Sequence, residues 1–131
     1  MKTNLFYVVI LACLAIVGCG GQGFLPAGGK VTFDDGSPVS GGGIAFQTDT
    51  FMADGTINPD GTFTLSSLKP GDGLPPGMYK VTVGWTEYDA NERTIDRVDP
   101  LFGDRQTTTL SAEVTKGGKN QFEFVVSKPK K

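Results

Sequence analysis

The chain has 131 residues, with 19 glycines, 8 prolines, no histidine and a formal charge of −2 at pH 7. This length suits one compact domain, and the scattered basic side chains offer nucleic acid no electrostatic footprint, so nucleic acid is not expected as a partner. The lack of histidine removes the commonest general base and the commonest transition-metal ligand.

The N-terminus has the pattern of a secretory signal peptide. Lys2 supplies a positive head, residues 5–17 form an uncharged apolar run, and small residues follow it at Gly18, Gly20 and Gly21. Such a run gives a helix of only about 20 Å, which is too short for the ~30 Å hydrocarbon core of a bilayer. We therefore expect a cleaved signal peptide over residues 1–18 rather than a permanent span.

Cys19 stands where the apolar run gives way to glycine, so its thiol has three possible roles: a disulfide, a buried core position or a covalent modification. The stretch Ile16-Val17-Gly18-Cys19 resembles the lipobox of bacterial lipoproteins, with isoleucine in place of the usual leucine. In that family the cysteine is alkylated with diacylglycerol and becomes the acylated N-terminus after cleavage. The resemblance implies lipidation of Cys19; a plain secretory signal or an uncleaved short anchor is the alternative.

A disulfide at Cys19 has no available partner. The other cysteine, Cys13, lies inside the apolar run and would leave with the signal peptide. Acyl chains contribute about 0.8 kcal/mol for each buried CH₂, so several of them anchor a protein stably to a membrane. We expect residues 19–27 to form the lipidated cysteine and a glycine-rich tether. Gly20 is not the aspartate that retains many enteric lipoproteins in the inner membrane, which favours the outer membrane.

Period-2 alternation of apolar and polar side chains recurs from Gly28 onward and predicts short β-strands. No segment of this part shows helical periodicity. We predict an all-β domain over residues 28–127, an antiparallel seven-stranded β-sandwich, followed by a basic tail over residues 128–131. The side chains expected to face inward include Val31, Phe33, Ile44, Phe46, Phe63, Leu65, Tyr79, Val81, Val83, Trp85, Leu110, Ala112, Val114, Phe122, Phe124 and Val126.

Two tight turns are predicted to close β-hairpins. Asp60-Gly61, within Asn58-Pro59-Asp60-Gly61, is expected to supply the positive-φ positions of a hairpin turn. The second expected hairpin joins the last two strands across Lys116-Gly117-Gly118-Lys119.

Two stretches resemble the carboxypeptidase regulatory-like and transthyretin-like domains. They are GKVTFDDGSPVSGGGIAF, from Gly29, and NPDGTFTLSSLKPGDGLPPGMYKVTV, from Asn58. The resemblance implies a prealbumin-like, Ig-like sandwich, and it extends to small bacterial lipoproteins in which such a domain follows the lipobox. The chain departs from the family pattern in the loop after Lys69 and in the long stretch from Thr86 to Thr109.

Catalysis is not expected. Transthyretin-like hydrolases of 5-hydroxyisourate resemble one another in using histidines and a C-terminal Tyr-Arg-Gly-Ser-type motif, whereas this chain has no histidine and ends in Lys128-Pro129-Lys130-Lys131. No nucleophile elbow, Cys/His pair or paired-carboxylate motif is present, and no cofactor or metal is expected. The stretch from Asp54 lacks EF-hand spacing, because Thr56 takes the third position and Leu65 the twelfth, so a turn is favoured over a calcium loop.

Several side chains are candidates for contact with a ligand or partner. Tyr88 and Phe102 lie in irregular sequence, and the stretch 86–109 also carries Arg93 and Arg97 among several acidic residues. This stretch is either a partner-binding loop or a solvated excursion with surface ion pairs worth about 0–1 kcal/mol each. Trp85 is either a sugar-stacking platform or, as its phase with Val83 favours, a core residue. The basic tail either contacts an anionic surface or is a solvated end.

The sequence therefore predicts a non-catalytic, lipid-anchored cell-envelope protein that acts as a binding or structural module. Its expected partners are the membrane, through acylated Cys19, and an envelope protein or glycan. The alternative is a carbohydrate-binding accessory domain that uses exposed loop aromatics such as Tyr88 and Phe102.

Replacing Cys19 by serine tests the lipobox. Cys19→Ser removes the thiol that would be acylated, so we expect no acylated form and an accumulation of uncleaved precursor. Intact-mass measurement of the protein from membranes detects both the acylation and the cleavage. Normal processing of this variant, or an unmodified thiol on the native protein, would contradict the lipobox.

Overall fold

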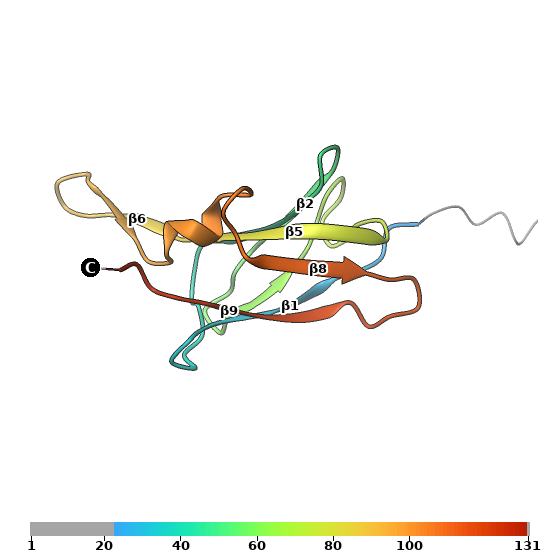
Figure 1. The fold of residues 1–131 in the computed structure, drawn as a ribbon, viewed down its shortest axis with the longest axis horizontal. Coiled ribbons are helices and arrows are strands. Elements are labelled where there is room, and N and C mark those ends of the chain that lie inside the picture. Colours follow the sequence, from blue (N-terminus) through green and yellow to red (C-terminus); the bar gives the residue numbers. More distant parts are fainter. Residues whose placement is uncertain (1–22, 131) are drawn as a thin grey trace, which may run out of the picture.

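The computed structural model describes residues 23–130, so the predicted signal peptide and Cys19 lie outside the described residues. Two larger sheets, with strand orders β4-β1-β9 and β3-β2-β5-β8, pack together in a β-sandwich-like arrangement (Figure 1), and β6-β7 forms a third, two-stranded sheet. The only helical element among the described residues is a 3₁₀ helix. The elements are β1 (Gly28–Phe33), β2 (Gly43–Gln47), β3 (Met52–Thr56), β4 (Thr62–Thr64), β5 (Gly77–Gly84), β6 (Thr86–Tyr88), β7 (Thr94–Asp96), η3 (Pro100–Gly103), β8 (Leu110–Val114) and β9 (Gln121–Val126).

The predicted all-β class is confirmed, and alternation decides which side chains enter the core. In β5, Tyr79, Val81 and Val83 are buried while Lys80 is exposed, as the period-2 pattern predicts. In β9, the outward-facing Val125 is 56% exposed, although it is as apolar as its buried neighbour Val126. Phase along the strand, rather than hydrophobicity alone, therefore sets the face.

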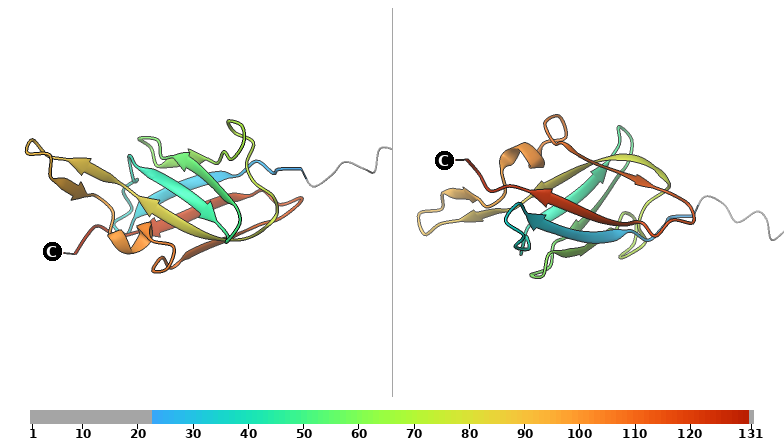
Figure 2. Two further views of the ribbon diagram at one scale, coloured as in Figure 1. Left: turned by 90° about the horizontal axis from the view of Figure 1, so that it is seen from above. Right: turned by 60° about the horizontal axis from the view of Figure 1, so that its bottom comes forward.

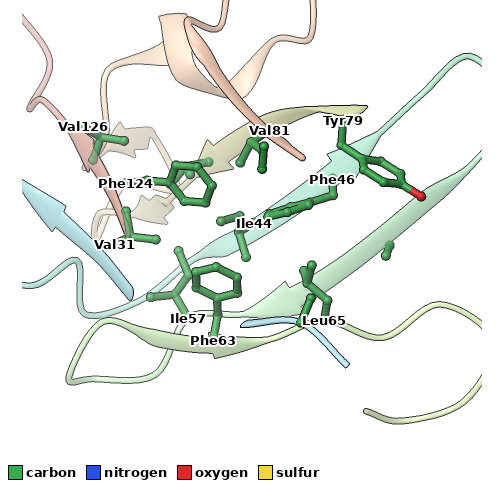
Figure 3. Packing of buried hydrophobic residues seen from close by; sticks show 14 of the residues in the cluster. Val31, Ile44, Phe46, Ile57, Phe63, Leu65, Tyr79, Val81, Phe124 and Val126 are labelled. Atoms are coloured by element: carbon green, nitrogen blue, oxygen red, sulfur yellow. The ribbon is translucent and has the colours of Figure 1, made fainter. Parts of the chain in front are cut away.

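Phe46 of β2 is the centre of the packing between the two larger sheets. Its ring is fully buried and lies 6.3 Å from the ring of Phe63 in β4, and 5.5 and 5.9 Å from those of Phe122 and Phe124 in β9. Figure 3 shows Phe46 between Phe124 and Tyr79, with Phe63 nearby. These centroid distances lie within the range in which aromatic pairs attract one another. The cluster therefore joins one sheet to both edge strands of the other.

Strand number and pairing differ from the predicted antiparallel seven-stranded sandwich. Every pair of strands is antiparallel except β1 and β9, which run parallel over the full length of β1. The structure has nine strands, of which three and four belong to the two larger sheets. Figure 2 shows β1 in blue lying beside β9 in red, so the first and last strands of the domain are direct neighbours.

Neither predicted turn closes a β-hairpin of one sheet. The turn at Asn58–Gly61 leads from β3 in the four-stranded sheet to β4 in the three-stranded sheet, and the turn at 116–119 leads likewise from β8 to β9. Of Asp60 and Gly61, only Gly61 has a positive φ, of 89°. The first hairpin prediction is confirmed in part: the Asn58 N–H donates to the Thr62 carbonyl at 2.8 Å and Asp54 pairs with Ser66 across the turn, although β3 and β4 belong to different sheets. The second was wrong, because a tight turn fixes the local chain reversal, whereas the burial of both strands decides which sheet each strand joins.

Asn120 holds the second of these turns. Its side-chain Oδ1 accepts a hydrogen bond from the Thr115 N–H, and its Nδ2 donates one to the Thr115 carbonyl, both at 3.0 Å. Its own carbonyl accepts from the Gly28 N–H at 3.1 Å. With φ of 51°, Asn120 adopts the left-handed conformation that asparagine tolerates. One residue thus joins the end of β8 to the start of β1.

Part of the predicted tether belongs to the folded domain. Leu25 pairs with Leu74 through two backbone hydrogen bonds of 2.8 and 3.1 Å, Ala27 is buried, and the ring of Phe24 packs edge-on against Phe51. Leu74 itself is fully buried. The unusual loop after Lys69 therefore provides the surface against which the N-terminal segment docks.

This loop has its own internal support. The Asp72 carboxylate accepts hydrogen bonds from the backbone N–H groups of Ser67, Leu68 and Lys69 at 2.8–3.1 Å. At Gly73, with φ of 81°, an added Cβ would lie 1.8 Å from the Leu25 carbonyl oxygen. A side chain at position 73 would thus displace the N-terminal segment.

The long stretch 86–109, predicted as a partner-binding loop or a solvated excursion, is largely exposed and contains regular structure. Thr86–Tyr88 and Thr94–Asp96 pair as a β-hairpin, and Pro100–Gly103 forms the 3₁₀ helix, whose first turn is capped by the Asp99 carboxylate accepting from the Leu101 N–H. Figures 1 and 2 show this hairpin and the C-terminus at one end of the long axis, and the first described residues at the other. Within residues 23–130, no helix is long and apolar enough to cross a membrane.

Truncation of the central ring should weaken the whole sandwich. Phe46→Ala is expected to lower the free energy of unfolding by about 3–5 kcal/mol, because it removes a fully buried ring and leaves a cavity. Chemical denaturation measures this loss. If that variant fails to fold, Phe46→Leu replaces it, because this milder change is expected to lower the free energy of unfolding by only about 1–2 kcal/mol.

Val125→Ala is the matched control, because Val125 points outward from the neighbouring sheet. Its expected effect is below about 0.5 kcal/mol. Equal losses for Phe46→Leu and Val125→Ala would contradict the central role of the Phe46 ring.

Candidate functional site

Trp85 lies between β5 and β6, at the base of the β6-β7 hairpin. Its carbonyl accepts a hydrogen bond from the Arg97 N–H at 2.7 Å, which continues the hairpin ladder by one step. Its indole packs against the glycines that precede β2. A Cβ atom added to Gly41 would lie 2.9 Å from the indole Cε2 and Nε1 atoms, and a Cβ atom added to Gly42 would lie 2.6 Å from the Cβ of Trp85. The missing side chains at 41 and 42 therefore make room for the indole.

Trp85 is partly buried, so the sequence-based assignment to the core is only half right. Strand β5 ends at Gly84, and the indole packs against the edge of the core while one part of it lines an open groove of about 540 Å³. Volumes of about 300–1,000 Å³ are usual for small-molecule sites. The groove is lined by Phe33, Ser37, Ser40, Trp85, Glu87, Asp96, Arg97, Lys128 and Pro129, and we call it the Trp85 groove.

The hairpin contributes one charged wall of the Trp85 groove. Arg97 Nε donates to Glu87 Oε1 at 2.5 Å, and the Thr86 hydroxyl donates to Asp96 Oδ1 at 2.9 Å. The side chains of Arg97 and Glu87 are 49% and 45% exposed, so this ion pair adds little to stability. The pair instead fixes the positions of a donor and an acceptor beside the indole.

The C-terminal segment contributes the opposite wall. Lys128 Nζ donates to Asp35 Oδ2 at 3.3 Å and lies 5.2 Å from the centre of the Phe33 ring. The Asp35 Oδ1 accepts from both the hydroxyl and the N–H of Ser37. The Ser37 hydroxyl, then the Ser37 N–H and Lys128, lower the pKa of Asp35 from 3.8 to about 2. The first two residues of the predicted basic tail, Lys128 and Pro129, thus line the groove.

The sequence-based candidates occupy different places. Arg97 lines the Trp85 groove. Arg93 pairs with Asp89 at the far end of the hairpin with its side chain 75% exposed, and Tyr88, in β6, is 72% exposed. Phe102 belongs to η3 and packs against the core. Cys19 lies outside the described residues.

Sequence reasoning did not assign Phe33, Lys128 or the two serines to a site. Phe33 was expected only in the core, where its ring is indeed mostly buried. The one available signal was the run Gly41-Gly42-Gly43, since consecutive glycines before a strand mark a close approach of another group.

A second hollow, of about 550 Å³, lies on the outer face of the four-stranded sheet and across its β3 edge. Apart from Ile44 and one carboxylate, Asp54, its lining consists of small and hydroxyl-bearing residues, and it includes no aromatic ring and no cation. Among residues 23–130, no group of three or more acidic, cysteine or histidine side chains is placed to hold a metal ion. The Trp85 groove therefore has the more diverse chemistry of the two.

Comparisons with known proteins give no match: no family model, no curated protein and no solved structure is significantly similar to this chain. What the structure shows is a small all-β protein with several packed sheets.

The titration of Asp35 tests the wall formed with Lys128. The pKa of Asp35 is about 2 in the folded protein, against an ordinary value of 3.8. Its carboxylate therefore stabilises the fold fully above pH 3.8, and this stabilisation is lost as the pH falls through about 2. Carboxyl chemical shifts followed by NMR give the pKa directly. Ser37→Ala should raise it more than Lys128→Ala, because the Ser37 hydroxyl is the larger cause. The reverse order would contradict this geometry.

Proposed function

We propose that this protein is a non-catalytic, lipid-anchored module of the bacterial cell envelope that binds its partner through the Trp85 groove. The observation that carries the proposal is the placement of this groove. It is built by the hairpin and the C-terminal segment, at the end of the long axis opposite to the first described residues (Figures 1 and 2). A chain anchored at Cys19 would present the groove away from the bilayer.

The length of the remaining tether supports this arrangement. Because Phe24 and Leu25 pack against the domain, only residues 20–23 separate it from Cys19. Four residues extend at most about 14 Å, so the near end of the sandwich would stay at the membrane surface and the groove would be held outward at a fixed height. By analogy with enteric lipoproteins, Gly20 favours the outer membrane for this anchor.

The finer fold assignment is also part of the proposal. A sandwich with a three-stranded and a four-stranded sheet matches the seven strands of the transthyretin-like and carboxypeptidase regulatory-like domains that the sequence resembles. The Pro-Gly-x-Tyr signature has a clear role here, because the Tyr79 hydroxyl donates to the Pro75 carbonyl at 2.7 Å and fixes the entry to β5. A Tyr corner of this kind occurs at strand entries in Greek-key sandwiches.

The non-catalytic character of the proposed module rests on the composition of the chain. Without histidine, and without a nucleophile paired with a base in the sequence, the chain offers no recognised constellation for acyl or phosphoryl transfer. A partly exposed tryptophan beside charged side chains in a groove is instead a feature of a recognition site.

Photo-crosslinking in intact cells tests this proposal. A diazirine side chain placed at the exposed groove residue Ser40 should give a discrete adduct with an envelope component. The same probe at Lys116, an exposed turn residue at the membrane-proximal end, should give none of that adduct, as should the Ser40 probe combined with Cys19→Ser (Figure 1). Equal adducts from both positions, or none from Ser40, would overturn the proposed role of the groove.

A further inference from the structure

We infer that the ligand of the Trp85 groove is a neutral saccharide, whose ring stacks beside the Trp85 indole while its hydroxyl groups bond to the charged walls. This inference rests on the proposed function, because it names the chemical class of ligand for the same groove. Three features of the groove support it: its aromatic surface, its charge balance and its mixture of donors and acceptors.

The aromatic surface is that of Trp85, which follows the end of β5. Phe33, the last residue of β1, also lines the groove, but it is only 6% exposed and Lys128 lies over its ring. The backbone at Gly41 and Gly42 contacts the indole. The C–H groups on one face of a sugar ring carry partial positive charge, while the face of an aromatic ring is negative, so the two surfaces attract one another. A flat and fixed indole loses little entropy on binding such a ring.

The charges that line the groove cancel. Glu87 and Asp96 oppose Arg97 and Lys128, so the lining carries no net formal charge. Lys128 is also held by Asp35, and Arg97 by Glu87. An anionic ligand would have to approach two carboxylates, and a cationic ligand would meet two fixed cations. The charge balance therefore favours an uncharged ligand.

The walls offer donors and acceptors side by side. Arg97 and Lys128 only donate hydrogen bonds, Glu87 and Asp96 only accept them, and the hydroxyls of Ser37 and Ser40 do both. Sugar hydroxyls also do both, so each can bridge an ion pair without breaking it. A proline-rich peptide would use the aromatic surface but presents mainly carbonyl acceptors, so it would offer Glu87 and Asp96 no donor beyond Arg97 and Thr86, which they already have.

The binding experiment can use the fluorescence of Trp85, because it is the only tryptophan in the chain. The full chain, purified from membranes in a sugar-free detergent, is titrated with neutral tetrasaccharides of glucose, xylose, mannose and N-acetylglucosamine. At least one should shift the Trp85 emission and saturate with a Kd of about 1 mM or tighter. Oligogalacturonate and a proline decapeptide serve as the anionic and peptide ligands and should bind at least about tenfold more weakly.

Variants assign the binding to the groove. Measured by calorimetry, Trp85→Ala should reduce the affinity about tenfold or more, and Trp85→Phe, which keeps a ring and protects the fold, should give a smaller loss. Tyr88→Ala is the matched control, because Tyr88 is an exposed aromatic residue of the same hairpin that does not line the groove. The Tyr88→Ala variant should bind the saccharide with the same affinity as the unaltered chain.

Three results would overturn the saccharide inference: no saturable binding of any neutral saccharide, stronger binding of the anionic or peptide ligand, or equal affinity of the Trp85→Ala variant. Each of these leaves the crosslinking result at Ser40 unaffected. A Ser40 adduct without saccharide binding would retain the groove as the binding site and assign it another ligand. Saccharide binding without a Ser40 adduct would support the inferred ligand class and contradict the proposed role of the groove in the envelope.

Discussion

Contact between the Phe46 ring and the rings of β4 and β9 is the constraint on which the rest of the structure depends. Strands β4 and β9 are the two edges of the three-stranded sheet, so a single residue of β2 holds both edges against the four-stranded sheet. With the sheets fixed in this way, the ends of β1 and β5 lie close enough for Phe33 and Trp85 to line one groove. The Trp85 groove is therefore a consequence of sheet packing.

Much of the fold could be predicted from local pattern, while the pairing of strands could not. Alternation with period 2 is a property of each strand, so the inward faces of β1, β2, β5, β8 and β9 were correctly identified. The parallel partnership of β1 with β9, and the two turns that lead from one sheet to the other, depend on contacts between residues far apart in the sequence. The β6-β7 hairpin was missed because its strands have no buried face and so no alternation to detect.

The candidate site was only partly predictable for a similar reason. Arg97 was singled out because it lies in an unusually long connection, but its partners in the groove come from four separate parts of the chain. Trp85 was in phase with the core residues before it, and the end of β5 at Gly84, together with the space above Gly41 and Gly42, moves its indole to the rim. The end of a strand at a glycine leaves no mark in hydrophobic periodicity.

The parallel pairing of β1 and β9 has a mechanical consequence. An anchor at the N-terminus and a ligand held at the distal end would pull the domain along its long axis, which is also the direction of these two strands (Figure 1). Parallel ladders have evenly spaced hydrogen bonds, so tension in this direction shears all of them together instead of opening them one after another. In the proposed arrangement, the terminal strands would therefore resist force between the membrane anchor and a bound ligand.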